Sequence, residues 1–440
     1  MLPVPLTKLH LKFTALTRFR PMMRIVDVSA FYSPSGGGVR TYAHAKLTAA
    51  ARFGHEVIVI APGERHEVVS RVPGGLLVTI PAPRLPVDRR YRYFDDERLL
   101  HSVLDAWMPD HVEASSPWSS ATMVGRWQGA ATRSLVMHAD PLAAYAYRWL
   151  GGIASTQTID RWFGRFWSHL RGLGRMFDSV VCANDKLTER LRTGLVPNAE
   201  TIRMGVEPGL FSPALRSQRV REAALAAVGL EPTATLLVGV GRLSAEKRWD
   251  LVIRAAGECA RRIPVGLLLV GDGSKRQKLE LLAEQYSNVQ VLPPIGDRHE
   301  LARLLASADA LVHGCEAETF CLVAAEARAS GIPMIVPDRG AAADQLAPGA
   351  GTTYAAGREA SLEQAIVRFV SRGPELQRAA AARAASQVRT MDEHFAELFA
   401  RYEAMGPRHA VAPAAVSAGG AAMLEPMPQI ALARSRVRIQ

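Results

Sequence analysis

Short runs of aliphatic and β-branched residues alternate with helical stretches along most of this 440-residue chain, and the pattern occurs twice. The runs lie at residues 24–28, 56–60, 76–80, 111–114, 134–138 and 179–183, and then at 235–240, 266–270, 289–292, 310–313 and 333–336. Strands that alternate with helices form parallel sheets covered by helices on both faces. The sequence therefore predicts an α/β fold with two doubly wound parallel-sheet domains.

The segment 201–213, TIRMGVEPGLFSP, separates the two halves with two glycines and two prolines. We expect a first domain at 23–205, a second at 206–383, and an amphipathic helix at 384–405 that ends the folded part. Residues 1–22 are interpreted as an extension before the true start, and 406–440, rich in alanine and glycine, as a tail without fixed structure.

Composition excludes several classes of protein. Lys and Arg outnumber Asp and Glu by 53 to 42, a net charge of +11 that suits nucleic acid, an anionic membrane or a phosphorylated substrate. We expect no nucleic-acid partner, because no recognised module accompanies the charge. Four scattered cysteines provide neither a disulfide framework nor a C-x-x-C metal site. No uncharged apolar stretch reaches bilayer-spanning length, so we predict a cytoplasmic protein.

Three consecutive glycines, Gly36, Gly37 and Gly38, follow the first expected strand and open a helix. Glycines let backbone N–H groups approach an anion closely, and the helix N-terminus favours negative charge. The spacing matches neither the dinucleotide nor the Walker fingerprint. The segment therefore predicts a phosphate-binding turn, with a merely flexible turn as the alternative.

Arg242 and Lys247 lie five residues apart between a strand and a helix in the second half. A guanidinium fork and a point charge in such a turn can converge on one diphosphate. The alternative is two solvated cations at a helix start.

Two carboxylates mark the segment after residue 311. Glu318 and Glu326 are eight residues apart, which on one helix is about 12 Å along the axis. This separation suits two groups that hold opposite ends of a nucleotide sugar, and it is too wide for a glycosidase pair. Glu326 lies in the apolar run LVAAEA, where a carboxylate needs hydrogen-bond donors, from a bound ribose or from Arg328 or another neighbouring cation.

Taken together and in this order, these motifs resemble those of the family 4 retaining glycosyltransferases of the GT-B fold. The resemblance rests on Gly36-Gly37-Gly38-Val39, Gly205-Val206-Glu207, Arg242 with Lys247, and Glu318 with Glu326, and it covers roughly residues 23–405. It implies two Rossmann-like domains that face each other across a cleft, with the helix at 384–405 crossing back to the first.

The resemblance also implies roles for individual residues. Arg242 and Lys247 would bind the donor's diphosphate, Glu326 its ribose and Glu318 the transferred sugar. His138 matches the family's active-site histidine near the reaction centre, with a structural histidine as the alternative. The donor site would be completed by Gly36, Gly37, Gly38, Thr319, Phe320, Cys321 and Leu322.

Three positions depart from the family pattern. Phe320-Cys321 replaces the usual Phe-Gly, so a side chain enters the donor site and can narrow the sugar pocket. Met204 and Glu207 replace a frequent Asn and Asp in the connector. Because of these departures, the motifs indicate the fold but do not identify which nucleotide sugar is the donor.

We therefore expect a retaining hexosyltransferase that uses a nucleotide sugar and needs neither a metal nor another cofactor. GDP-mannose is the preferred donor. The alternatives are a UDP-glucose-dependent glucosyltransferase and a catalytically silent nucleotide-sugar-binding protein of the same fold. No protein nucleophile is evident, so we expect attack on the face from which the diphosphate leaves.

The acceptor is expected on the first domain, as a glycan or a lipid-linked molecule. The segments 89–93, RRYRY, and 161–171, RWFGRFWSHLR, mix cations with aromatic residues, a composition typical of surfaces that rest on anionic headgroups. We therefore expect peripheral contact with the inner face of the cytoplasmic membrane. The alternative is that the aromatic side of 161–171 packs inside.

Overall fold

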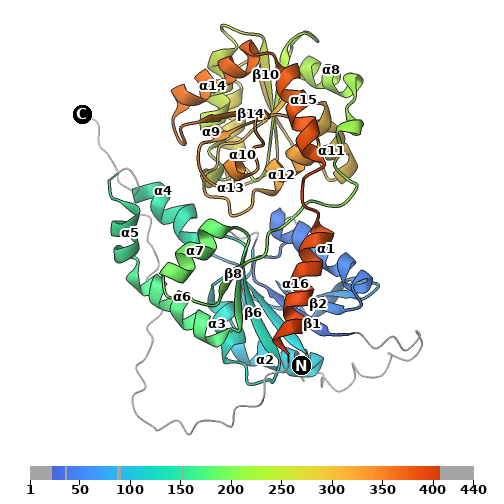
Figure 1. Cartoon of the computed structure of the whole chain (residues 1–440), viewed down its shortest axis with the longest axis vertical. Coiled ribbons are helices and arrows are strands. Elements are labelled where there is room, and N and C mark those ends of the chain that lie inside the picture. Colours follow the sequence, from blue (N-terminus) through green and yellow to red (C-terminus); the bar gives the residue numbers. More distant parts are fainter. Residues whose placement is uncertain (1–21, 35–36, 87–90, 151–152, 407–440) are drawn as a thin grey trace.

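The computed structural model describes residues 22–34, 37–86, 91–150 and 153–406. The predicted extension and tail therefore lie almost entirely outside the described residues, as do Gly36, Arg89 and Arg90. The described part forms two lobes, with the first half of the chain in one lobe and most of the second half in the other (Figure 1).

The first lobe contains β1 (Arg24–Ser29), α1 (Gly38–Arg52), β2 (Glu56–Gly63), β3 (Glu67–Val72), β4 (Gly75–Pro81), α2 (Glu97–Trp107), β5 (His111–Ser115), α3 (Ser119–Arg126), β6 (Thr132–Met137), the π-helical turn η2 (Leu142–Ala146), α4 (Tyr147–Leu150), α5 (Thr156–Trp162), α6 (Gly164–Met176), β7 (Ser179–Cys182), α7 (Asp185–Thr193) and β8 (Ala199–Thr201).

The second half contains η3 (Pro213–Leu215), α8 (Gln218–Ala227), β9 (Thr235–Val240), η4 (Ala245–Lys247), α9 (Trp249–Cys259), β10 (Val265–Val270), α10 (Arg276–Ala283), β11 (Val289–Leu292), α11 (Arg298–Ser307), β12 (Ala310–Val312), α12 (Leu322–Ala329), β13 (Met334–Pro337), α13 (Ala341–Asp344), β14 (Gly351–Tyr354), α14 (Glu359–Ser371), α15 (Pro374–Ala385) and α16 (Met391–Met405).

Each lobe is built on a largely parallel sheet. Within the described residues the strand orders are β3-β4-β2-β1-β5-β6-β7-β8 and β11-β10-β9-β12-β13-β14. The central strands are buried along almost their whole length, as expected when helices cover both faces of a parallel sheet. The predicted α/β fold with two parallel-sheet domains is confirmed.

Three strands were missed by the sequence reasoning, and all three lie at or near sheet edges. β3 pairs antiparallel with β4 and is mostly exposed, so its sequence lacks the apolar run of a buried strand. β8 and β14 have three and four residues, too few for a pattern to show.

The helix predicted at 384–405 begins later than expected, at Met391. Residues 384 and 385 still belong to α15, and the chain between the two helices is not helical. Thr390 and Glu393 form a capping box that fixes the new start: Thr390 Oγ1 accepts from Glu393 N, and Glu393 Oε2 accepts from Thr390 N at 2.7 Å.

α16 lies against the first lobe, although it follows the second lobe in the chain (Figure 1). Its residues Phe395, Phe399 and Tyr402 are fully buried in an apolar cluster with α1 and β2. The chain returns to the first lobe beside the segment on which it left. Val206 N donates to the carbonyl oxygen of Arg389, and Met391 N donates to the carbonyl oxygen of Val206. A Cβ on Gly205 would lie 2.1 Å from the backbone of Thr390, so only glycine permits this crossing.

His394 joins α16 to this crossing. Its Nδ1 donates to the carbonyl oxygen of Arg203 at 3.0 Å, so its Nε2 accepts from the hydroxyl of Tyr42 at 3.1 Å. Burial lowers the pKa of His394 to about 3, and the nearby ammonium of Lys46 acts in the same direction. The ring is therefore neutral in the folded protein.

We predict that His394 makes the folded state less stable as the pH falls from about 6.5 towards 3. In that window the unfolded chain binds a proton that the folded chain does not, so the free energy of unfolding loses up to about 1.4 kcal/mol per pH unit. Urea unfolding at pH 7, 6 and 5 should show a steeper decline for the wild type than for His394→Gln. Parallel profiles for the two proteins would contradict the assignment.

Candidate donor site between the lobes

The loop 313–321 leads from β12 to α12 and docks on the first lobe. Thr319 Oγ1 donates to the carbonyl oxygen of His138 at 2.8 Å, and Asn184 Nδ2 donates to the carbonyl oxygen of Thr319. Leu322, the first residue of α12, lies close to Gly38, since a Cβ on that glycine would be 3.3 Å from Leu322 Cδ1. The glycine turn, His138 and the segment 318–322 therefore meet between the lobes, at the carboxyl ends of both sheets.

Lys247 and Glu318 are in direct contact. Lys247 ends the turn η4, and its ammonium donates to Glu318 Oε1. His313 Nε2 lies 3.6 Å from the same oxygen. Burial by itself would raise the pKa of Glu318, but Lys247 and His313 outweigh it and lower the pKa, so the carboxylate is ionised.

Lys247 remains charged for the same reason. Burial disfavours its ammonium form, but the carboxylate of Glu318 raises its pKa above the ordinary value. A Cβ on Gly314 would lie 2.5 Å from the carbonyl oxygen of Lys247, so the turn η4 packs directly on the loop 313–321. Residues 71 positions apart are thereby held in one ion pair.

Arg242 lies at the entrance of the same site. Its guanidinium is 5.8 Å from the ring centroid of Tyr91 in the first lobe, a cation–π contact between the lobes. It is exposed, and it is near enough to Glu318 to help lower the pKa of that carboxyl. Its backbone is fixed by Trp249, whose Nε1 donates to the carbonyl oxygen of Arg242 at 2.9 Å.

Glu326 is 5% exposed and bonded to Arg298, whose guanidinium lies 2.8 Å from Glu326 Oε1. Burial raises the pKa of Glu326, and Arg298 opposes that rise. The expected spacing along one helix was wrong, because α12 begins at Leu322 and Glu318 lies in the preceding loop. Arg298 is thus a neighbouring cation of Glu326, as one of the two interpretations of this carboxylate expected.

His138 follows β6, and its side chain is half-buried. Its Nε2 lies 3.2 Å from Ser115 Oγ, and its ring packs at 4.8 Å against the ring of Tyr42. Burial lowers the pKa of His138 to about 4, with Asp27 opposing the shift. The imidazole is thus neutral at physiological pH and can donate or accept a hydrogen bond at the site.

Cys321 has φ 61° and ψ 70°, a left-handed conformation that side chains other than glycine rarely adopt. A glycine, the residue expected here from the family resemblance, adopts this conformation without strain. The thiol is 3% exposed and lies 3.6 Å from His313 Nε2. It packs in the apolar cluster of the second lobe.

His313 and Arg298 were not assigned by sequence reasoning, and Tyr91 was assigned to the expected membrane-contacting segment 89–93 and not to the donor site. His313 directly follows a strand of the second sheet, and this position is the signal that could have identified it. Arg298 and Tyr91 gave no such signal, since each reaches the site only through a contact with a distant segment.

In the part of the chain that the structure describes, His313, Glu318 and Cys321 form a cluster that could hold a metal ion. Their ligand atoms all lie within 4.8 Å of one another. The ammonium of Lys247 already contacts Glu318 in that cluster. A divalent cation there would meet a buried positive charge, so these residues do not fit a resident metal well.

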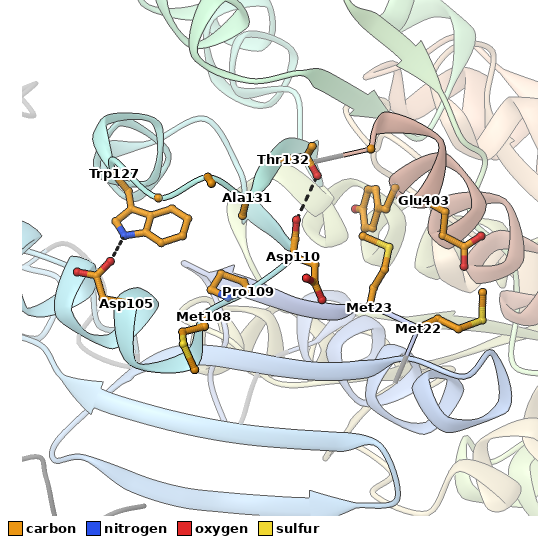
Figure 2. A pocket seen from close by; sticks show the side chains of 14 residues that line it. Met22, Met23, Asp105, Met108, Pro109, Asp110, Trp127, Ala131, Thr132 and Glu403 are labelled. Atoms are coloured by element: carbon orange, nitrogen blue, oxygen red, sulfur yellow. Dashed lines mark hydrogen bonds between the residues drawn. The ribbon is translucent and has the colours of Figure 1, made fainter. Parts of the chain in front are cut away.

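Cavities in the described part of the chain also lie outside this cluster. A cavity of about 770 Å³ is at the amino ends of β1, β5 and β6, far along the strands from the site. Figure 2 shows Trp127 hydrogen-bonded to Asp105 on one side of it, with Met22, Met23 and Glu403 on the other. A second cavity of about 450 Å³ lies between the lobes and is lined in part by Asn184, Thr319, Phe320 and Arg328.

We predict that Cys321→Val destabilises the protein while Cys321→Gly is tolerated. A β-branched side chain is strained at positive φ, so the valine variant should lose about 1–3 kcal/mol of unfolding free energy relative to the glycine variant. Chemical denaturation of both variants measures the difference. Equal stabilities would mean that residue 321 leaves the left-handed conformation.

The two halves of the chain match separate family models. Residues 37–206 match the glycosyl transferase 4-like domain, and residues 220–387 match glycosyl transferases group 1. The described helices also include none with the length and apolar content required to span a bilayer.

The chain is similar in sequence to mannosyltransferases over most of its length. The chain is 31% identical over 386 residues to a GDP-mannose-dependent α-(1-6)-phosphatidylinositol dimannoside mannosyltransferase of Mycobacterium tuberculosis, covering 87% of this chain and 97% of that protein. It is 30% identical over 345 residues to a GDP-mannose-dependent α-mannosyltransferase of the same species, covering 74% and 82%.

A solved structure shows the same arrangement of lobes. Sucrose-phosphate synthase from Thermosynechococcus elongatus superposes with a TM-score of 0.68 at 20% identity, covering 87% of this chain and all of that one. The motifs between the lobes, the two matched family models and the near full-length relatives agree. The chain belongs to the family 4 glycosyltransferases, which have the GT-B fold.

Proposed function

We propose that this hexosyltransferase moves a mannosyl group from GDP-mannose to a glycan or lipid-linked acceptor, with retention at the anomeric carbon. The proposal rests mainly on the contact between Lys247 and Glu318, in a loop whose Thr319 is bonded to the backbone of His138. A fixed positive charge, a carboxylate and a neutral imidazole would then surround the bound donor sugar. The names of the relatives at 31% and 30% identity favour GDP-mannose.

The positive groups suit a departing diphosphate. As the sugar–phosphate bond breaks, negative charge accumulates on the leaving oxygens, and charges fixed in advance stabilise it most effectively. Lys247 and Arg242 would supply this stabilisation, together with the N-terminus of α12 at Leu322. The N-terminus of α1 lies near that of α12, because a Cβ on Gly38 would be 3.3 Å from Leu322 Cδ1.

The carboxylates suit the sugars of the donor. Glu318 is ionised and can accept hydrogen bonds from hydroxyls of the transferred hexose, while Lys247 keeps one oxygen engaged. Glu326 has one oxygen bonded to Arg298, which leaves the other for the ribose hydroxyls. Each carboxylate then retains a cationic partner when the donor binds, which offsets part of the cost of its burial.

We propose a reaction in which the acceptor oxygen attacks the face from which the diphosphate departs. The bond from the anomeric carbon to the diphosphate oxygen breaks, the new glycosidic bond forms, and the acceptor's proton passes to the departing phosphate oxygen. Neither a covalent enzyme intermediate nor a metal enters this scheme. NMR of the first linkage formed from GDP-α-mannose should show the α configuration, and EDTA should leave turnover unchanged.

Replacing Lys247 or Arg242 with alanine should lower kcat about 10²–10³-fold, the usual effect of removing one transition-state charge contact. The rate of mannosyl transfer from GDP-mannose measures this. Arg261→Ala is the matched control, because the Arg261 side chain is 74% exposed and pairs with Glu258 on the surface. Full activity in a folded Lys247→Ala protein would remove Lys247 from the mechanism.

The identity of the donor can be tested by ligand stabilisation. A nucleotide that binds only the folded state raises the melting temperature, so GDP should give a larger shift than UDP or ADP at equal concentration. A preference for UDP, with transfer from UDP-glucose, would overturn the GDP-mannose assignment. Binding without transfer or hydrolysis of either donor would favour the catalytically silent alternative.

A surface of the first lobe supports a lipid-linked acceptor. Trp162 and Ile153 are 59% and 78% exposed, and Arg161 and Arg165 beside them are also exposed. Trp167 is buried and donates from Nε1 to Asp160 at 3.1 Å, so the aromatic side of 161–171 packs inside only in part. α4 and α5 form a side of the first lobe away from α16 (Figure 1). We propose that this surface contacts the inner face of the cytoplasmic membrane.

Flotation with vesicles of phosphatidylcholine and phosphatidylglycerol tests this contact. Trp162→Ala combined with Arg161→Glu should reduce the bound fraction, because it removes an interfacial aromatic and reverses one charge, worth about 1 kcal/mol per cation at an anionic surface. Leu376→Ala is the matched control on α15 of the second lobe, where the leucine is 77% exposed. Unchanged binding in the double variant would place membrane contact elsewhere.

A further inference from the structure

A buried group of charges lies beneath His138 in the first lobe. Lys46 of α1 donates to Asp27 Oδ2 of β1 at 2.8 Å and lies 2.6 Å from Glu113 Oε1 of β5, and all three side chains are essentially inaccessible. Tyr402 of α16 donates to Glu113 Oε2 at 2.6 Å. The ammonium therefore has two carboxylate partners, which is the condition under which charges are kept inside a protein.

Ser115 connects this group of charges to His138, which lies at the proposed reaction centre. Ser115, the last residue of β5, donates from Oγ to Asp27 Oδ1 at 3.1 Å. The hydroxyl oxygen of Ser115 also lies 3.2 Å from His138 Nε2. Because the serine has a single hydroxyl hydrogen, and that hydrogen points to Asp27, its oxygen must accept from the histidine. Nε2 therefore carries the ring proton.

We propose that Ser115 and Asp27 are positioning residues that hold His138 as the Nε2–H tautomer and leave Nδ1 to accept a hydrogen bond from a substrate hydroxyl. This inference rests on the proposed function, because the substrate hydroxyl belongs to the donor sugar or the acceptor. Second partners of this kind commonly fix which nitrogen of a histidine is protonated. Nothing in the sequence signals it, since Asp27 lies within β1, Ser115 ends β5 and His138 follows β6.

Two further contacts restrict the ring and its backbone. Tyr42 packs edge to face on the imidazole at 4.8 Å, and Thr319 of the second lobe holds the carbonyl of residue 138. The backbone is thus set by the second lobe and the tautomer by the first. Burial lowers the pKa of His138, and the charges of Asp27 and Lys46 oppose each other in their effect on that pKa.

The test is ¹⁵N NMR of the histidine rings in the full chain, with the His138 signal assigned by comparison with His138→Gln. The wild type should show protonated Nε2 and unprotonated Nδ1 at neutral pH. In Ser115→Ala the signal should move towards a mixture of both tautomers, and Ser115→Thr, which keeps the hydroxyl, should restore it. Ser134→Ala, a buried serine on the neighbouring strand β6, is the matched control and should leave the spectrum unchanged.

Kinetics give a second readout. Loss of one ordering hydrogen bond of about 1 kcal/mol should lower kcat for mannosyl transfer about threefold to tenfold in Ser115→Ala, with little change in KM. A wild-type Nδ1–H tautomer, or an Nε2–H tautomer that persists in Ser115→Ala, would overturn the inference. The expected tautomers in a protein without transferase activity would support the positioning role and remove the proposed function instead.

Discussion

The crossing of two backbone segments at Gly205 and Thr390 places the two sheets so that their carboxyl edges face each other. The segment that leaves the first lobe and the segment that returns to it pair through Val206, and α16 then buries its aromatic side in the first lobe. Residue 205 can carry no side chain at this crossing, because a Cβ at Gly205 would overlap the returning chain. Both sheets end in helix N-termini and glycine turns, so facing edges bring two anion-binding surfaces together.

The buried charges of the second lobe that face the first are paired with one another. Lys247 neutralises Glu318, and Arg298 neutralises Glu326. Unpaired carboxylates at these depths would be protonated or would destabilise the fold. In the proposed mechanism, this pairing would leave both carboxylates available to sugar hydroxyls and would hold the ammonium of Lys247 near the departing diphosphate.

The same principle operates in the first lobe, where Lys46 holds Asp27 and Glu113 below His138. Here the charges are completely buried, so they cannot contact substrate, and their effect on the site passes through the hydroxyl of Ser115. A neutral, oriented imidazole is more useful beside a sugar hydroxyl than a charged one that repels the nearby cations. The low pKa of His138 is the consequence of this burial.

Sequence reasoning located the long strands, the glycine turns and the residues around the proposed donor site, because these depend on patterns within short segments. It failed for β3, β8 and β14, whose short or exposed runs carry no pattern, and for the start of α16, which depends on the pairing of residue 390 with Val206. It also placed Glu318 on a helix that begins four residues later, at Leu322.

By itself, then, the sequence determined two parallel sheets and the identity of the chemical groups at their edges, since hydrophobic periodicity and glycine placement are local properties. The tertiary structure alone decided which charges meet: Lys247 with Glu318, Arg298 with Glu326, and Ser115 with His138. Each of these contacts joins segments at least 23 residues apart. Their geometry depends on how helices pack on the sheets and how one lobe is carried back to the other, and no local pattern encodes that.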